Sequence, residues 1–277
     1  MSENMLLQQL PIGVFDSGMG GLTVLSALRN TLPQESFIYL GDTARLPYGT
    51  KSPETVKQYA EQMAAILVEQ RIKALVIACN TATTAALTHL QQRLHYMPVI
   101  GVVEPGAKAA IDACQQGSIS LLATETTVAS KAYQTIISQQ LPHTRIKAIP
   151  CGLLVALAEE GLTDHAITRE TLRYYLTDIS EDETILLGCT HFPVFKNAIQ
   201  EMLPSTIKIV DSAQATAQVV KQKLNEKGLM QGEDHQGQVS YLVTDSIDRF
   251  KRVGAIFLHH SLDDKPVTLI DTPCSTA

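Results

Sequence analysis

The chain has no tryptophan, few aromatic residues and no long run of basic or apolar residues. Phe, Trp and Tyr make up 5% of its 277 residues, and 22 Lys and Arg stand against 28 Asp and Glu, for a formal net charge of −6. A nucleic-acid surface needs clustered Lys and Arg, so nucleic acid is disfavoured as a partner. No segment reaches the roughly 18 apolar residues of a membrane span, and no basic region precedes an apolar core at the amino terminus. These absences predict a cytoplasmic protein without a membrane partner.

Disulfide patterning is also absent, because no two of the five cysteines form a C-x-x-C pair. Their number is odd and the chain is too long to need a disulfide framework, so we interpret them as free thiols. Buried cysteine is most often a small apolar residue. Zinc sites usually use closely spaced ligand pairs, and Cys189 with His191 has no second pair, so no metal is expected. The cysteines are Cys79, Cys114, Cys151, Cys189 and Cys274.

What the chain does have is a series of short apolar runs that alternate with helical patterns. Because the runs are almost continuously hydrophobic, they are typical of strands buried on both faces of a parallel sheet between helices. The predicted fold class is therefore α/β. The expected strands cover residues 11–15, 37–40, 74–78, 99–103, 119–122, 146–149, 184–187, 207–210 and 239–243.

Two pairs of similar segments indicate an internal repeat. Residues 12–18 (IGVFDSG) resemble residues 100–106 (IGVVEPG), and residues 75–81 (LVIACNT) resemble residues 185–191 (ILLGCTH). Their matching order predicts two pseudo-symmetric three-layer lobes with mainly parallel sheets. Open α/β sheets bind ligands at the carboxyl ends of their strands, so we expect the active site in the cleft between the lobes. The first lobe is expected to hold residues 1–98 plus 207–277, and the second residues 99–206.

A glycine-rich turn follows the first expected strand at residues 16–21 (DSGMGG). Glycines here let backbone N–H groups converge on an anion at the start of a helix. The spacing matches neither the dinucleotide motif nor the P-loop, so no nucleotide cofactor is expected. The turn is either a carboxylate or phosphate site or a tight connection capped by Asp16 or Ser17.

Cys79 and Cys189 each end an expected strand and begin a helix. A helix amino terminus lowers the pKa of a thiol and makes thiolate more available near neutral pH. One Cys with His and Asp also suits the nucleophile of a thiol hydrolase. Two thiols, one from each lobe, suit better a reaction that removes the α-proton of an amino acid and returns a proton to the opposite face. Asp16 is then expected to assist Cys79, and His191 to assist Cys189.

Four motifs together resemble those of the glutamate racemases, in the aspartate/glutamate racemase superfamily. The resemblance spans roughly residues 12–257. It implies interconversion of L- and D-glutamate without pyridoxal phosphate, metal or nucleotide, a supply of D-glutamate for peptidoglycan, and a homodimer. The motifs, in family order, are residues 14–22 (VFDSGMGGL), 41–49 (GDTARLPYG), 78–82 (ACNTA) and 187–193 (LGCTHFP).

The resemblance also implies a role for individual side chains. Cys79 would handle the α-proton of D-glutamate and Cys189 that of L-glutamate, with Asp16 and His191 assisting. Residues 122–128 (LATETTV) resemble a segment that places a threonine near the side-chain carboxylate, here Thr124, with Thr127 as a second candidate. The residues expected to hold the ammonium and carboxylates are Asp16, Ser17, Tyr48, Gly49, Asn80, Thr81, Thr190 and His191.

The chain departs from the family pattern at two places. Ala123 stands where the family often has Gly, which shifts at most a backbone segment. Cys151-Gly152 stands where the family often has Cys-Pro, so the alignment of the acidic residue that follows is loose. An acidic helper on the Cys79 side is therefore either Glu159 or Glu160.

Two other functions remain open. Aspartate racemase belongs to the same superfamily, although residues 42–45 (DTAR) and 47–49 (PYG) resemble the glutamate group. A regulatory binding protein with the same fold, such as an inhibitor of DNA gyrase, is the other alternative. The presence of both cysteines favours a catalyst.

Overall fold

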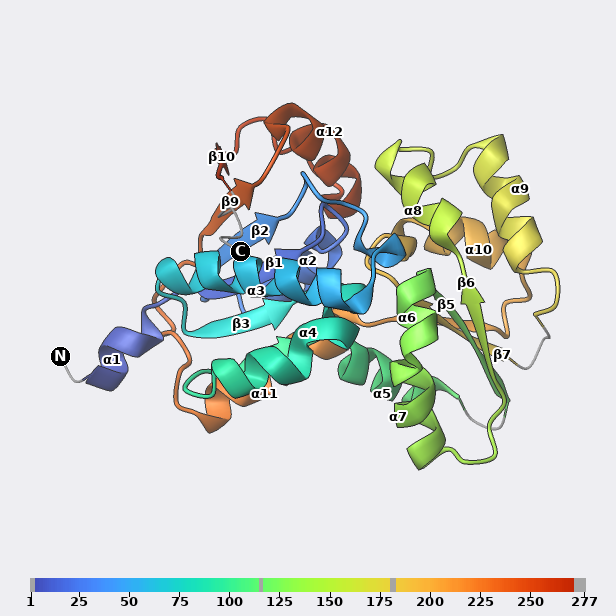
Figure 1. The fold of residues 1–277 in the computed structure, drawn as a ribbon, viewed down its shortest axis with the longest axis horizontal. Coiled ribbons are helices and arrows are strands. Elements are labelled where there is room, and N and C mark those ends of the chain that lie inside the picture. The colour runs from blue at the N-terminus through green and yellow to red at the C-terminus, as the bar shows by residue number, and fades with distance from the viewer. Residues whose placement is uncertain (1–2, 115–116, 180–182, 272–277) are drawn as a thin grey trace.

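The computed structural model describes residues 3–114, 117–179 and 183–271; Cys274 lies outside them. The described residues form two lobes side by side, and the first and last elements both belong to the larger lobe (Figure 1). The larger lobe contains a six-stranded sheet and the smaller a four-stranded sheet, and the described strand pairs are all parallel. The α/β class is confirmed.

Helices and strands alternate along the chain as predicted. In chain order the elements are α1 (Glu3–Gln8), β1 (Ile12–Asp16), α2 (Leu22–Thr31), β2 (Phe37–Gly41), η1 (Tyr48–Thr50), α3 (Pro53–Glu69), β3 (Ala74–Ile77), α4 (Asn80–Arg93), β4 (Val99–Gly101), α5 (Val103–Ala113), β5 (Ser118–Ala123), α6 (Glu125–Ser130), α7 (Ala132–Gln140), β6 (Ile146–Pro150), α8 (Gly152–Glu159), α9 (Ala166–Tyr175), β7 (Glu183–Gly188), η2 (Phe192–Phe195), α10 (Lys196–Met202), β8 (Lys208–Asp211), α11 (Ala213–Glu226), β9 (Val239–Val243), α12 (Ile247–Leu258) and β10 (Val267–Leu269).

In the first lobe the strand order is β10-β9-β2-β1-β3-β4. Successive residues of a strand point to opposite faces, and β1 shows this. Val14 packs with side chains of α2, α11 and α12, whereas Phe15 packs with those of α3 and α4. Each face of the sheet is therefore covered by helices, which explains the continuous hydrophobicity of its strands.

The second lobe repeats this arrangement on a smaller scale, with the strand order β6-β5-β7-β8. Leu121 of β5 packs with side chains of α5 and α7. Leu122, the next residue, packs with those of α8, α9 and α10 on the opposite face. The second lobe therefore also has three layers.

The two sheets share a strand order, since β2-β1-β3-β4 in one corresponds to β6-β5-β7-β8 in the other. The repeat at residues 75–81 and 185–191 is confirmed, because β3 and β7 occupy equivalent positions. The repeat at residues 12–18 and 100–106 is wrong, because β1 corresponds to β5 whereas Ile100 lies in β4. Short apolar strands that lead into helices are common in an α/β fold, so a resemblance of seven residues does not identify equivalent strands.

The chain passes between the lobes twice, and at each passage the expected boundary assigns one strand to the wrong lobe. β4 was expected in the second lobe but pairs with β3, and β8 was expected in the first lobe but pairs with β7. By sheet membership and helix packing, the chain crosses between lobes near Val102 and Ser212. Both strands lie at a sheet edge, and hydrophobicity alone does not reveal which edge a short strand joins.

The nine expected strands are present, with ends within two residues of the observed bounds. Sequence patterning did not find β10 (Val267–Leu269), which is short and has one half-buried and two exposed residues. A strand without a buried face carries no hydrophobic pattern to detect.

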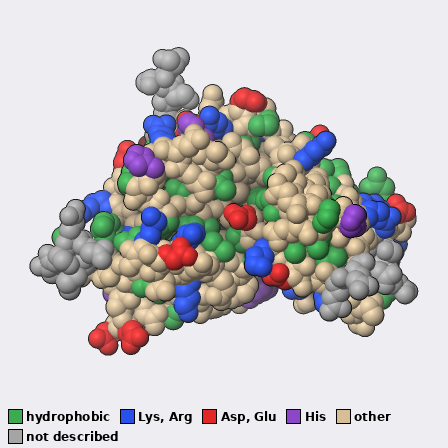
Figure 2. All heavy atoms as spheres, turned by 90° about the horizontal axis from the view of Figure 1, so that it is seen from below, with side chains coloured by type: hydrophobic (Ala, Val, Ile, Leu, Met, Phe, Trp, Pro, Cys, Tyr) green, Lys and Arg blue, Asp and Glu red, His purple; other side chains and the backbone are tan. Residues whose placement is uncertain are grey.

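The described surface carries charges of both signs. On the face drawn in Figure 2, the described Lys and Arg side chains are interspersed with Asp and Glu and gather into no basic stripe. Within the described residues, no helix has the length and apolar character needed to span a membrane.

The packing of α2 generates a stability prediction. Leu25→Ala should lower the free energy of unfolding by about 3 kcal/mol, because it leaves a cavity under a fully buried side chain. Asn30→Ala, at an exposed position of the same helix, should change it by less than about 0.5 kcal/mol. Urea denaturation followed by circular dichroism measures both. Equal costs for the two variants would contradict the packing described for α2.

Candidate active site

The carboxyl ends of strands from both lobes meet at one cavity. Asp16 ends β1, Cys79 follows β3, Thr124 follows β5 and Cys189 follows β7. The cavity measures about 20 Å³, so it is nearly closed. The expected interlobe site is therefore present among the described residues. Its lining residues are Ser17, Pro47, Tyr48, Gly49, Cys79, Asn80, Thr81, Thr124, Val155, Cys189, Thr190 and His191.

Most of the site residues proposed from the sequence line this cavity. Asp16 and Glu159 lie behind its wall, since both are buried and neither is among the lining residues. Pro47 and Val155 were not proposed. Pro47 lies inside the motif at residues 41–49 and was detectable by position, whereas Val155 is one of several apolar residues of α8 and carries no signal of its own.

The glycine-rich turn is held by the Asp16 side chain. Asp16 Oδ2 accepts hydrogen bonds from the backbone N–H groups of Gly18 and Gly21, both at 3.0 Å. Burial raises the pKa of Asp16, although the charge of His191 and these backbone bonds oppose the shift. Of the two interpretations left open, the described contacts support a tight connection held by Asp16. The expected cap is wrong, because the residue that caps α2 is Gly21, without a side-chain bond.

Cys79 caps the amino terminus of α4. The backbone N–H of Ala82 donates to Cys79 Sγ at 3.4 Å, and Cys79 Sγ lies 3.7 Å from Ser17 Oγ. Burial raises the pKa of Cys79 to about 12 and the charge of Asp16 adds to this, while the bonds from Ala82 and Ser17 oppose it. The expectation of a lowered pKa is wrong for this thiol, because desolvation outweighs the helix terminus.

Asp16, which was expected to assist Cys79, makes no hydrogen bond with its thiol. The residue within hydrogen-bonding distance of the thiol is Ser17, and Asp16 acts on it only through its charge. Asp16 Oδ1 instead accepts from Thr190 Oγ1 of the second lobe at 3.5 Å. Asp16 therefore joins the turn of one lobe to residues 189–191 of the other.

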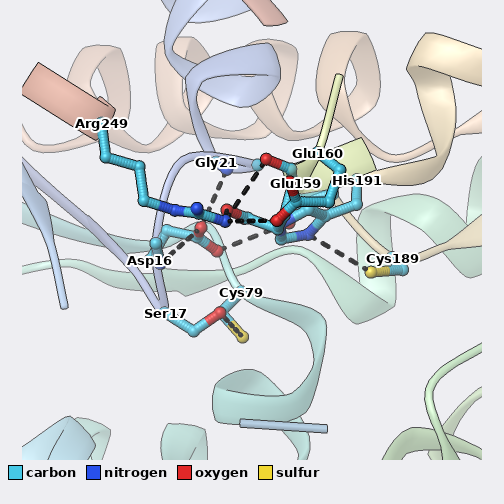
Figure 3. A network of polar contacts seen from close by, with 12 residues as sticks. Asp16, Ser17, Gly21, Cys79, Glu159, Glu160, Cys189, His191 and Arg249 are labelled. Carbon is cyan, nitrogen blue, oxygen red and sulfur yellow. Dashed lines mark hydrogen bonds and ion pairs between the residues drawn. The ribbon is translucent and has the colours of Figure 1, made fainter. Parts of the chain in front are cut away.

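Cys189 begins a chain of polar contacts that ends at the surface (Figure 3). Its Sγ lies 3.8 Å from His191 Nδ1, and His191 Nε2 lies 2.6 Å from Glu159 Oε1. The other carboxylate oxygen, Glu159 Oε2, makes no hydrogen bond but lies 3.6 Å from Arg249 Nη2 of the first lobe. We treat this last contact as an ion pair, since the distance is too long for a hydrogen bond.

The acidic helper is thus on the opposite side from the one expected. Glu159 is buried and contacts His191, so it belongs to the Cys189 side and not to the Cys79 side. Glu160 is exposed and pairs with Arg249 at 3.4 Å. The sequence did not reveal this, because which residue of a helix end faces the cavity depends on how the helix docks.

His191 is surrounded by groups that favour its charged form. Burial disfavours the imidazolium, but the hydrogen bonds and charges of Cys189 and Glu159 outweigh it and raise the pKa of His191 well above its usual range. The edge of the Phe257 ring packs against the imidazole, with centroids 5.3 Å apart. The charged His191 therefore lies directly beside the Cys189 thiol.

Two glycines of the first lobe permit the close approach of the second. A Cβ added to Gly20 would lie 2.6 Å from both His191 Nδ1 and Thr190 Oγ1. One added to Gly49 would lie 2.6 Å from Thr124 Cβ. Only glycine fits at these points without moving the facing side chains.

The loop that carries Tyr48 is anchored by Asp42. The Tyr48 hydroxyl donates to Asp42 Oδ2, and Arg45 Nε donates to the same oxygen at 2.7 Å. Thr244 Oγ1 donates to Asp42 Oδ1 at 3.0 Å. These bonds fix residues 47–49 at the cavity wall, so the loop is more than a connection.

Hydroxyl groups from both lobes meet at another part of the wall. A hydrogen bond of 2.9 Å joins Thr81 Oγ1 to Thr124 Oγ1, and Thr124 donates to Thr127 Oγ1 at 3.0 Å. Thr126 Oγ1 lies 3.0 Å from the carbonyl oxygen of Gly49. Thr124 is the expected threonine of this segment that lines the cavity, and Thr127 supports it from behind.

Asn80 presents an unpaired donor. Its Oδ1 accepts from the hydroxyl of Tyr133 at 2.6 Å, while its Nδ2 is buried and has no partner. Buried polar atoms are nearly always hydrogen-bonded, so an unpaired one in a cavity wall indicates a ligand. No cluster of three or more His, Cys, Asp and Glu side chains suited to a metal ion occurs in the described part of the chain.

Comparisons with known proteins agree with this geometry. The Asp/Glu/Hydantoin racemase family profile matches residues 18–220. The glutamate racemase of Geobacter metallireducens is 46% identical over 255 residues, which cover 91% of this chain and 94% of the relative. A crystal structure of glutamate racemase from Thermus thermophilus in complex with beta-chloro-D-alanine superposes with a TM-score of 0.84 at 41% identity, covering 95% of this chain and 98% of the other.

A second solved structure supports the same assignment. Glutamate racemase from Francisella tularensis in complex with D-glutamate gives a TM-score of 0.86 at 33% identity, covering 96% of this chain and 99% of the other. The match extends over both lobes. The chain belongs to the Asp/Glu/Hydantoin racemase family.

Proposed function

We propose that this protein is a glutamate racemase, which interconverts L- and D-glutamate by proton transfer to and from Cys79 and Cys189 and needs no cofactor. The observation that carries the proposal is that thiols from equivalent strands of two lobes line one cavity. That cavity measures about 20 Å³, room for roughly one water molecule, so the lobes must move apart to admit an amino acid.

We propose that the two thiols carry opposite protonation states before L-glutamate reacts. Charged His191, paired with Glu159, stabilises the thiolate of Cys189. Burial and Asp16 raise the pKa of Cys79 to about 12, so this residue carries its proton. Cys189 then removes the α-proton of L-glutamate, and Cys79 donates a proton to the opposite face of the carbanion.

The reverse reaction requires the opposite states. Cys79 becomes the thiolate that receives the α-proton of D-glutamate, and the Ala82 N–H and Ser17 hydroxyl are placed to stabilise it. Cys189 then carries the proton that inverts the centre. When Cys189 carries its proton, Glu159 is the negative group that still favours the charged form of His191, so Glu159 is important in both directions.

The substrate is proposed to contact polar groups of both lobes. The unpaired Asn80 Nδ2 supplies a donor for a carboxylate. Other donors and backbone groups in the wall come from Ser17, Tyr48, Gly49, Thr81, Thr124, Thr190 and His191. Fixed donors in a dry cavity stabilise the charge that develops on the carbanion far better than water does.

We propose further that the D-glutamate serves peptidoglycan synthesis and that the protein is a cytoplasmic homodimer. Family resemblance supports all three statements. Nothing in the described site favours aspartate or a purely regulatory role, and the anchored loop at residues 47–49 belongs to a motif of the glutamate group.

The substrate is tested directly with the purified protein. The circular dichroism signal of either enantiomer of glutamate should decay to zero as the protein racemises it. The signal of either enantiomer of aspartate should change little. Racemisation of aspartate without racemisation of glutamate would overturn the proposed substrate.

The two thiols should be separable by isotope exchange. Cys79→Ser and Cys189→Ser should each lower kcat about 10³-fold, because each removes an acid–base group. Because enantiomers are equally stable, kcat/KM must fall equally in both directions. Exchange of the α-proton in D₂O, followed by NMR, should persist for L-glutamate in Cys79→Ser and for D-glutamate in Cys189→Ser.

Cys114→Ser provides the control for thiol replacement. Cys114 is buried in the second lobe and lies outside the cavity lining, so this variant should racemise glutamate at the normal rate. Normal turnover in Cys79→Ser or Cys189→Ser would refute the two-thiol mechanism.

Glu159→Gln should change the pH dependence of the reaction. The carboxylate helps to raise the pKa of His191, so its removal lowers that pKa. Charged His191 is lost as pH rises through its pKa, and the alkaline limb of the kcat profile should therefore move to lower pH. Glu160→Gln, at an exposed position, should leave the limb in place. Identical profiles for the two variants would contradict the role of Glu159.

A further inference from the structure

Tyr133 forms a hydrogen bond between the lobes that the mechanism above does not use. It lies on α7 of the second lobe and is fully buried. Its hydroxyl donates to Oδ1 of Asn80, the first residue of α4 in the first lobe, at 2.6 Å. Asn80 follows Cys79 directly in sequence and lines the cavity.

In this hydrogen bond the Tyr133 hydroxyl is the donor and Asn80 Oδ1 is the acceptor. Burial raises the pKa of Tyr133 far above its ordinary value, so the hydroxyl keeps its proton. A buried O–H donor requires an acceptor, and the only hydrogen bond found for this hydroxyl among the described residues is the one to Asn80. A flipped amide would leave the hydroxyl proton without an acceptor. The bond therefore requires Oδ1, not Nδ2, to face Tyr133.

The opposite end of the amide is then left for a ligand. Asn80 Nδ2 is buried without a partner, and the residue is only 2% exposed. A primary amide nitrogen is a donor only, so its natural partner is an acceptor such as a carboxylate oxygen. Both carboxylates of a bound glutamate are acceptors of this kind.

The Tyr133 hydroxyl is itself held in place. A Cβ added to Gly106 of α5 would lie 2.9 Å from it, so the backbone of this helix packs closely against the hydroxyl. Gly106 is close to Ser212, where the chain crosses between lobes, since the same Cβ would lie 3.0 Å from Ser212 Cβ. The hydroxyl thus reaches Asn80 from a rigid part of the second lobe.

We propose that Tyr133 is a positioning residue that holds the side-chain amide of Asn80 with its NH₂ group toward the cavity, where it binds a carboxylate of the substrate. The inference rests on the proposed function, because it takes the ligand to be an amino dicarboxylate. It also makes substrate binding depend on the contact between lobes, since the donor belongs to one lobe and its orienting hydroxyl to the other.

Tyr133→Phe is the first test, because it removes the hydroxyl and retains the ring. Without the bond the amide can rotate, so KM for both enantiomers of glutamate should rise roughly tenfold. The contact to a carboxylate exists before and during the reaction, so kcat should stay within about twofold. Tyr241→Phe, which removes the hydroxyl of a buried tyrosine outside the cavity, should leave both constants unchanged.

A double-variant cycle separates positioning from general stability. Asn80→Ala should itself raise KM, and adding Tyr133→Phe to it should raise KM no further, since the hydroxyl then has no amide to orient. The melting temperature of each variant is measured alongside. If Tyr133 only stabilised the fold, Tyr133→Phe would lower the melting temperature, and its effect on KM would be the same with and without the Asn80 amide.

Asn80→Asp tests the orientation and does not rely on a Tyr133 variant that folds. The aspartate keeps an acceptor for Tyr133 but turns a negative oxygen toward the substrate carboxylate, so KM should rise about a hundredfold or more. An unchanged KM in Tyr133→Phe, an equal further rise in the Asn80→Ala background, or retained affinity in Asn80→Asp would each overturn the inference. Failure of the wild-type protein to racemise glutamate would instead refute the proposed function.

Discussion

The close contact between the two lobes is the constraint on which the site depends. Cys79 and Cys189 belong to different sheets, and they line one cavity because Gly20 fits under His191 and Gly49 under Thr124. The same contact removes water from the thiols and from the polar groups around them. Desolvation then strengthens each charge interaction within the cavity, including those among Asp16, His191 and Glu159.

The pseudo-symmetry of the fold therefore ends at the side chains. Each thiol follows the third strand of an equivalent sheet, yet Cys79 contacts a serine hydroxyl and a backbone N–H, whereas Cys189 contacts a histidine paired with a carboxylate. Burial keeps a proton on Cys79, whereas Cys189 lies beside the cation of His191. Two identical groups are thereby given different roles at the same pH, as a two-base reaction requires.

Much of this fold and site was predictable from local patterns. The strands, the α/β class and the repeat that contains both cysteines follow from apolar runs and from residues placed at strand ends. Most of the cavity lining follows from the resemblance of four motifs to those of the glutamate racemases. The errors share one cause. The edge positions of β4 and β8, the pairing of residues 12–18 with 100–106, and the side on which Glu159 acts all depend on how separate elements dock.

The sequence by itself determined which strands form, which thiols end them and which chemistry two such thiols suit. These properties follow from the order of neighbouring residues. Only the tertiary structure decided that Ser17 and not Asp16 touches Cys79, that Glu159 supports His191, and that Tyr133 turns the amide of Asn80 toward the cavity. Each of these contacts joins residues far apart in the chain, and burial sets their strength, so no local pattern encodes them.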